Sequence, residues 1–213
     1  MVETVVDPSS GDIAVILPPE KIRKKAVNGK AKGSGFENTI AKLLSEKFKP
    51  LEFRRSQSSG AILGGRNQIH LDKFSDHAKA LFIGDVVPTN EADVLRDEGW
   101  QFRFTVECKF YKDVDTLSQL FKSPQVTAWY EQARIDASKI PDKLPLLIFK
   151  FNHTPVFCAT DAELTTPPKC STVLRMWYNL KETGERRSIY IMLFDEVLQE
   201  LDWLKTNTKE VTT

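Results

Sequence analysis

Three charged side chains interrupt two apolar stretches of the sequence that we predict to be strands. Asp85 falls within FIGDVV, and Glu107 and Lys109 fall within FTVECKFYK. An ionisable group in such a segment is costly unless a counter-charge or a metal ion meets it. Carboxylate oxygens are ligands that Mg²⁺ prefers, and a neighbouring lysine can orient water or offset the charge of a phosphate. These residue types predict a metal-dependent site that acts on phosphate esters.

The same residues also fit a structural ion pair on an exposed sheet face. Alternation along the predicted strand puts Glu107 and Lys109 on one face and Val106 and Cys108 on the other. An acid two residues before a lysine occurs once in the chain, although both residue types are abundant. This pair also follows a predicted strand that contains an internal aspartate. The combination favours the metal site over the ion pair.

The bulk composition describes an ordinary globular protein. With 213 residues, 41% of them hydrophobic and 28% charged, one domain with extensions is expected. The net charge of +1 means that any contact with nucleic acid depends on local basic patches. The three cysteines lack CxxC spacing, which favours reduced thiols. No apolar run reaches the length of a membrane span, so we expect an intracellular, cytoplasmic protein that makes no membrane contact.

Hydrophobic periodicity and turn residues predict the elements that position these groups. The first half contains a helix over 34–48 with Ser34 as its N-cap, a strand over 51–57, a long loop or insertion over 58–80, a strand over 81–88, a turn or short excursion over 90–99 and a strand over 100–112. The second half contains a helix over 117–140 with a break or new start at Pro124, strands over 144–152 and 155–160, a hairpin over 172–194 and a helix over 195–205 capped by Asp195. This order predicts an α/β core with a mixed central sheet.

The chain divides into three expected parts. Residues 1–32 form an N-terminal arm, residues 33–160 a core, and residues 161–213 a C-terminal extension packed on that core. Within the arm, IAVIL is either irregular or an edge strand. The basic run over 21–32 is either a solvated tail or a means of gripping phosphates.

Two short motifs resemble those of the PD-(D/E)XK nuclease superfamily. GD at 84–85 and ECK at 107–109 match its metal-binding acid and its acid-x-lysine, and its core also runs helix, three strands, helix, strand. The resemblance therefore implies a restriction-endonuclease-like fold with a mixed central sheet flanked by helices, followed here by a hairpin and a helix. Within the superfamily, KGSGFEN and FRRSQSSG are most similar to archaeal-type Holliday-junction resolvases. This likeness covers roughly residues 30–152, and a phage or prokaryotic origin is compatible with it.

The sequence departs from the resolvase pattern in two places. Residues 58–80 intervene between the Arg-Ser step and the metal-binding aspartate, where those enzymes have a short gap. The hairpin and helix after residue 170 are additional. Relatives of the RecB type place a tyrosine four residues after a glutamine on the second helix. Here Gln125 is followed by Trp129 at that spacing, so that subfamily fits less well.

The resemblance implies a role for each matching residue. Asp85, Glu107 and the main-chain carbonyl of Cys108 would bind Mg²⁺, with Mn²⁺ as an alternative. Lys109 would serve the attacking water and the scissile phosphate. Glu37 would reach the site from the first helix, although it is equally compatible with a solvated helix position.

Further residues are implied in DNA binding. Ser56 or Ser58 would hold a phosphate, unless these serines only form turns. Side chains that would position the DNA backbone without reading sequence are Lys24, Lys25, Lys30, Lys32, Arg54, Arg55 and Lys112.

The leading functional hypothesis is a Mg²⁺-dependent, structure-selective endonuclease, specifically a homodimeric resolvase of four-way junctions, which are intermediates of DNA recombination and repair. One alternative is a restriction- or repair-type endonuclease with the same chemistry. Another is a DNA-binding module that kept the fold and lost cleavage. The apolar residues expected at a dimer interface are Trp129, Tyr130, Met176, Trp177, Tyr190 and Met192.

Two other groups of residues have types that could suggest a functional site. His70, Asp72, Asp76 and His77 could suggest a metal cluster, but the histidines are seven residues apart in an undefined loop. The aromatic pairs Trp129–Tyr130 and Trp177–Tyr178 are expected to pack in the core or at an interface rather than stack on bases.

Overall fold

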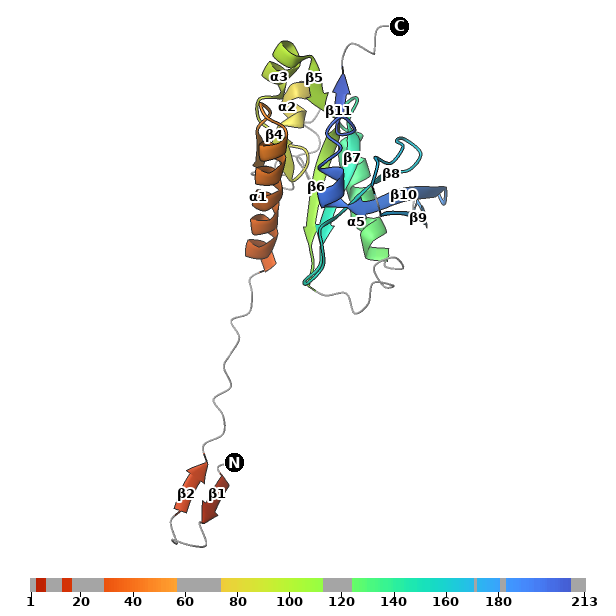
Figure 1. Cartoon of the computed structure of the whole chain (residues 1–213). Helices are drawn as coiled ribbons and strands as arrows, with labels where there is room; N and C mark the ends of the chain where they lie inside the picture. The colour runs from red at the N-terminus through yellow and green to blue at the C-terminus, as the bar shows by residue number, and fades with distance from the viewer. Residues whose placement is uncertain are drawn as a thin grey trace.

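The central sheet of the protein is built from the apolar segments that the sequence singles out. The computed structural model describes residues 3–6, 13–16, 29–56, 74–112, 124–170, 172–180 and 183–207. Seven strands form the sheet (Figure 1), in the spatial order β3 (Phe53–Arg55), β4 (Val86–Pro88), β6 (Phe104–Phe110), β7 (Leu144–Lys150), β8 (Phe157–Asp161), β10 (Arg186–Leu193) and β9 (Val173–Asn179). Only β6 and β7 pair in parallel. The predicted α/β fold with a mixed central sheet is confirmed.

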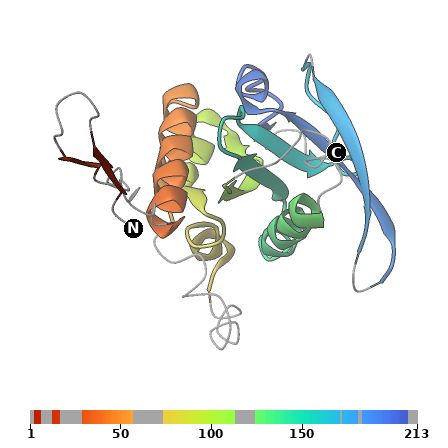
Figure 2. The ribbon, with the colours of Figure 1, turned by 90° about the horizontal axis from the view of Figure 1, so that it is seen from below.

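Two helices cover opposite faces of this sheet (Figure 2). Helix α1 (Gly29–Lys47) contributes Ile40 and Leu44 to a core that includes Val106 of β6. Helix α5 (Pro124–Ala137) packs Tyr130 against the other face, in a core that includes Leu147 of β7. Burial of these apolar faces is the main force that holds the layers together.

Helix α1 begins five residues before the predicted start, so the assignment of Ser34 as its N-cap is wrong. Lysine and alanine at three of the added positions favour a helix, whereas Gly29 and Gly33 disfavour one. Lys32 also anchors this first part of the helix, because its Nζ donates to Asn152 Oδ1 at 2.5 Å and lies 3.9 Å from the ring centroid of Phe110. Tertiary contacts therefore extend the helix beyond its apolar stripe.

Two segments predicted to lack regular structure contain helices. Residues 76–80 form α2 (Asp76–Ala80), and residues 91–98 form α3 (Glu91–Glu98), which ends at Gly99 with φ +74°. A buried ion pair holds α3 in place, because Glu91 Oε1 accepts from Lys143 Nζ at 2.7 Å and from the N–H of Phe102 at 2.9 Å. A polar composition concealed this helix, which is held by this long-range pair and by the burial of Val94 in the core.

The strand predicted over 100–112 is divided at Arg103. Its first part, β5 (Trp100–Phe102), pairs antiparallel with β11 (Lys205–Asn207) in a separate two-stranded sheet. Arg103 donates its N–H to Leu204 and accepts from the N–H of Leu144, so its two main-chain groups bind different partners. The second part, β6, then enters the central sheet.

The C-terminal hairpin is confirmed, with Gly184 at φ +71° in its turn, and β10 joins it to β8 of the central sheet. The helix predicted after it is wrong in length and cap. Helix α6 is only Phe194–Val197, and Leu193 rather than Asp195 is its N-cap. The following residues form tight turns that bring the ring of Trp203 within 4.9 Å of Phe104.

The chain also contains a two-stranded antiparallel sheet of β1 (Glu3–Val6) and β2 (Ile13–Ile16), so IAVIL contributes a hairpin strand. In the described part of the chain, no helix combines the length and apolar character needed to cross a membrane.

Candidate active site

Asp85 lies in a tight turn rather than in the middle of a strand. Residues 81–85 follow α2 without regular structure, and β4 begins only at Val86, so the strand predicted over 81–88 is wrong in its first part. The N–H of Asp85 donates to the carbonyl of Val106 at 2.8 Å, and its carbonyl accepts from the N–H of Ser56 at 2.8 Å. The turn therefore fixes Asp85 between the end of β3 and the middle of β6.

Gly84 makes this turn possible. Its φ of +98° belongs to a region that L-residues avoid, and a Cβ added there would lie 2.8 Å from the carbonyl oxygen of Val106. The neighbouring backbone cannot move away without breaking the hydrogen bond from Asp85 to the same carbonyl. The glycine before Asp85 therefore has a steric role in this chain. It allows the turn to approach Val106 closely enough for Asp85 to hydrogen-bond to β6.

Gly84→Ala is therefore expected to lower the free energy of unfolding by about 2–3 kcal/mol, through positive-φ strain and the clash with Val106. Urea unfolding measures this change. Gly35→Ala is the matched control, because Gly35 lies inside α1 with no atom near its added Cβ. That control is expected to gain about 0.5–1 kcal/mol. Equal stability of the two alanine variants would contradict the steric role of Gly84.

The carboxylate of Asp85 contacts the main chain of β6. Its Oδ2 accepts a hydrogen bond from the N–H of Cys108 at 2.9 Å. In an extended strand the N–H and C=O of one residue point toward the same edge. The carbonyl of Cys108 therefore faces the edge on which Asp85 lies, as the predicted ligand set requires.

Glu107 and Lys109 form the charged part of β6. Glu107 is only 7% exposed and accepts an ion-paired hydrogen bond from the Lys109 ammonium. Burial and then the negative charge of Asp85 raise the pKa of Glu107 to about 7, against the opposing effect of Lys109. Burial lowers the pKa of Lys109, but Glu107 and Asp85 outweigh it and raise that pKa overall. Two carboxylates thus repel each other here, and one lysine partly compensates.

Glu37 and Arg55 bring the first helix to the same region. The Arg55 guanidinium forms an ion pair with the Glu37 carboxylate, which links α1 to β3. Burial raises the pKa of the Cys108 thiol well above its usual value, and the negative charges of Asp85, Glu107 and Glu37 raise it further. Glu37 therefore lies within electrostatic reach of the Cys108 thiol, as Asp85 and Glu107 do.

The remaining predicted residues lie in different settings. Ser56 is buried, and its hydroxyl faces the carbonyl of Phe82 at 3.4 Å, which places it inside the Asp85 turn. Arg54 and Lys112 are exposed, whereas Lys32 is held by Asn152. Predicted residues whose positions or side chains fall outside the described part are Lys24, Lys25, Lys30, Ser58, His70, Asp72, Asp76 and His77.

Two residues near the site were missed in the sequence. Asp136 of α5 contributes to the raised pKa of Glu107, and only the packing of α5 on β6 could show this. Tyr111 is 50% exposed just beyond β6, and strand alternation continues the face of Glu107 and Lys109 to it. That alternation was available in the sequence and could have identified Tyr111.

The aromatic and methionine residues expected at a dimer interface are mostly internal. Tyr130, Met176 and Met192 are buried within the protein, so the expectation that they offer a dimer surface is wrong. Trp129 is partly buried against Phe149 and Phe151. Trp177, in contrast, is 47% exposed, so it is not a core residue, and the expected packing at an interface stays a prediction.

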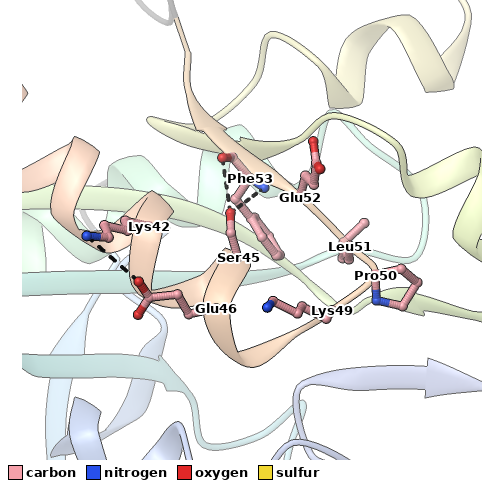
Figure 3. A pocket seen from close by; sticks show the side chains of 8 residues that line it. All are labelled: Lys42, Ser45, Glu46, Lys49, Pro50, Leu51, Glu52 and Phe53. Carbon is pink, nitrogen blue, oxygen red and sulfur yellow. Dashed lines mark hydrogen bonds and ion pairs between the residues drawn. The ribbon is translucent and has the colours of Figure 1, made fainter.

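A hollow of about 550 Å³ lies at the C-terminal end of α1 (Figure 3). Its lining includes the Lys42–Glu46 ion pair and Ser45, whose hydroxyl accepts from the N–H of Phe53 at 2.8 Å. None of the residues predicted to do chemistry lines it. The charged cluster and this hollow are therefore separate features of the structure.

Comparison with known proteins identifies the family of this chain. A family model described as "Phage putative PDDEXK endonuclease" matches residues 28–210, which is most of the chain. Neither the comparison with curated proteins nor that with solved structures gives a significant match. The matched span contains Glu37, Asp85, Glu107 and Lys109, together with every strand of the central sheet. The chain therefore belongs to this phage family of PDDEXK endonucleases.

Proposed function

We propose that the protein is a Mg²⁺-dependent endonuclease that hydrolyses phosphodiester bonds in branched DNA, with the four-way junction as its preferred substrate. The observation that carries the proposal is the contact between the Asp85 carboxylate and the main chain of β6. A fixed turn holds the Asp85 carboxylate on the N–H of Cys108, directly beside the Glu107–Lys109 pair. Family membership supports the nuclease chemistry, while the metal and the branched substrate are parts of our proposal.

The donor set fits Mg²⁺. In the part of the chain that the structure describes, no group of three or more His, Cys, Asp or Glu side chains is arranged as a metal cage. Mg²⁺ does not require one, since it commonly binds one or two carboxylates and completes its shell with water and substrate phosphates. Asp85 and Glu107 would supply the carboxylates, and the Cys108 carbonyl a third oxygen. Mn²⁺ accepts the same oxygen ligands.

The raised pKa of Glu107 is consistent with a cation site. Burial and the neighbouring Asp85 both disfavour its charge, and Lys109 alone does not restore the ordinary value. A bound divalent cation would supply the missing positive charge and, when present, would polarise the phosphate and acidify a bound water. The structure thus has an excess of negative charge where the proposed chemistry needs a cation.

The side chains of this protein would then perform distinct tasks. Lys109 remains protonated beside Glu107 and would hold the attacking water and offset charge on the scissile phosphate. Arg55 would orient Glu37 toward the site through their ion pair. Ser56 would act as a positioning residue, because its N–H and hydroxyl hold the turn that carries Asp85.

DNA would be positioned by basic residues outside the cluster. Arg54 and Lys112 are exposed, and both can contact phosphates without reading sequence. The basic residues of the N-terminal run, Lys24, Lys25 and Lys30, belong to the same proposal. Lys32 has a lesser part in it, since Asn152 and Phe110 already engage its ammonium group.

One contact supports a resolvase over a restriction-type enzyme. The two segments that resemble archaeal-type resolvases, KGSGFEN and FRRSQSSG, are distant in the sequence but are joined by the Glu37–Arg55 ion pair. A four-way junction is two-fold symmetric, so paired incision requires two copies of the site related by a two-fold axis. We therefore propose a homodimer, with an interface other than the buried residues first considered.

The test is cleavage of matched four-way, flapped, nicked and linear DNA, labelled on each strand in turn, with Mg²⁺ or with EDTA. The expected result is a pair of symmetric incisions near the branch point that depends on Mg²⁺. If linear duplex is cleaved as readily as the junction, the protein is a restriction- or repair-type endonuclease and not a resolvase. Binding without cleavage in both Mg²⁺ and Mn²⁺ would identify a non-cleaving module. Sedimentation of the free protein reports the oligomeric state.

A further inference from the structure

An exposed tryptophan on the outermost strand of the sheet, β9, lies near one arginine of the same strand and one of the neighbouring strand β10. Trp177 of β9 is 47% exposed. The Cζ atom of Arg175 lies 4.3 Å from the centroid of its ring, and that of Arg186, on β10, lies 4.6 Å from it. The two guanidinium carbons are therefore at most about 9 Å apart. We call these three residues the Arg-Trp-Arg surface.

The positive charges of this surface have no acidic partner in the described part of the chain. Neither Arg175 nor Arg186 forms an ion pair there, and Arg175 Nε donates only to the Ser188 hydroxyl at 3.0 Å. Arg187 differs: its guanidinium pairs with Glu163 at 2.8 Å and with Glu185 at 2.9 Å. Among the described residues, two cations without an ion-pair partner therefore lie beside one aromatic ring, on a chain of nearly neutral net charge.

The arrangement is poorly explained by stability alone. Exposed cation–π contacts contribute only about 0.5–1 kcal/mol, and the ring is not covered by other apolar groups to the extent of a core residue. The surface is also unsuited to a two-fold contact with its own copy, because such contact would bring like charges together. An anionic partner with flat, stackable groups fits both the guanidinium groups and the ring.

We propose that Arg175, Trp177 and Arg186 form a second DNA-contacting surface that binds the sugar–phosphate backbone of an arm of the substrate. This inference rests on the proposed function, since it takes DNA as the substrate. Guanidinium groups bind phosphates through paired hydrogen bonds, and an aromatic ring beside them can stack on a sugar or a base. The surface binds without taking part in the chemistry.

The position of the surface makes it a separate contact. Strand β9 is four places from β6 in the sheet, which corresponds to roughly 19 Å at the usual spacing between strands. The register of the strands also places Trp177 on the face of the sheet that carries Cys108, opposite the face of Glu107 and Lys109. A branched or extended substrate gains a second point of attachment there, which would orient the arm relative to the cleaved strand.

The test measures the salt dependence of binding to a fluorescent 30-base-pair duplex in EDTA. The variant Arg175→Gln/Arg186→Gln is expected to bind about tenfold more weakly, with a log–log salt slope smaller by about two. Trp177→Ala is expected to weaken binding and leave the slope unchanged. The control is Lys42→Gln/Arg96→Gln, which removes the same charge from exposed residues paired with nearby acids. Its slope is expected to match wild type.

The outcomes separate this inference from the proposed function. If wild type binds and cleaves DNA and the arginine variant keeps the wild-type slope, the surface is not a DNA contact and the nuclease stands. If the arginine variant instead loses self-association in sedimentation without a change of slope, the surface is a protein interface and the inference fails. If wild type neither binds nor cleaves DNA, the proposed function itself is contradicted, and the inference that rests on it fails with it. Thermal melting of each variant confirms that it is folded.

Discussion

Asp85→Asn is expected to reduce Mg²⁺-dependent cleavage by about 10³-fold or more. Asparagine has the shape of aspartate and retains an oxygen that can accept from the N–H of Cys108, the contact made at 2.9 Å in the structure. The turn should therefore survive while the negative charge that would attract the metal is lost. Single-turnover rates at saturating protein measure the chemical step without the influence of binding.

Binding of DNA by Asp85→Asn is expected to be unchanged or tighter in EDTA, because one negative charge near the phosphates is gone. The matched control is Asp202→Asn, at an exposed turn remote in sequence from the cluster; its rate should equal that of wild type. A cleavage rate for Asp85→Asn within about tenfold of wild type would remove Asp85 from the proposed metal site, and family membership would then require another acid.

Lys109→Met is expected to slow the chemical step by about 10²–10⁴-fold, the range for a lost acid–base or electrostatic group. Methionine has a side chain of similar length but no charge, so Glu107 would lose the partner that counteracts burial and Asp85. Its pKa should rise further, and more Mg²⁺ should be needed for half-maximal cleavage. Rates measured across a Mg²⁺ titration separate these two consequences.

Lys42→Met is the control for this substitution, since Lys42 is an exposed α1 residue paired with Glu46. A merely structural ion pair at Glu107–Lys109 would make a different prediction. In that case Lys109→Met would lower the free energy of unfolding and leave the rate at saturating Mg²⁺ intact. An unchanged saturated rate would therefore support the ion-pair interpretation, and a slow rate with unchanged stability would support the catalytic one.

The strand that carries Glu107 and Lys109 could be identified in the sequence because its information is local. Alternation of apolar side chains has the period of an extended backbone, so β6, β7 and the C-terminal hairpin were all predicted close to their observed positions. The shared face of Glu107 and Lys109 follows from the same alternation. The short GD and ECK motifs then indicated the superfamily.

Where a long-range contact decides the local conformation, prediction from the sequence was wrong. Helix α3 is held by the buried Glu91–Lys143 pair and by Val94 in the core, and the early start of α1 is supported by the hydrogen bond from Lys32 to Asn152. Apolar residues around Asp85 suggested a strand, but the positive φ of Gly84 and the hydrogen bond from Asp85 to Val106 make that segment a turn. Periodicity carries no information about such partners.

The sequence by itself determined the fold class, the order of the main strands and the residue types of the site. Only the tertiary structure decided that Asp85 meets Cys108 beside Glu107, that Glu37 pairs with Arg55, and that Trp177 is exposed beside two arginines. The physical reason is the range of the interactions involved. Backbone geometry and side-chain alternation act over a few residues, whereas strand register, burial and charge pairing join residues that the chain brings together only when it folds.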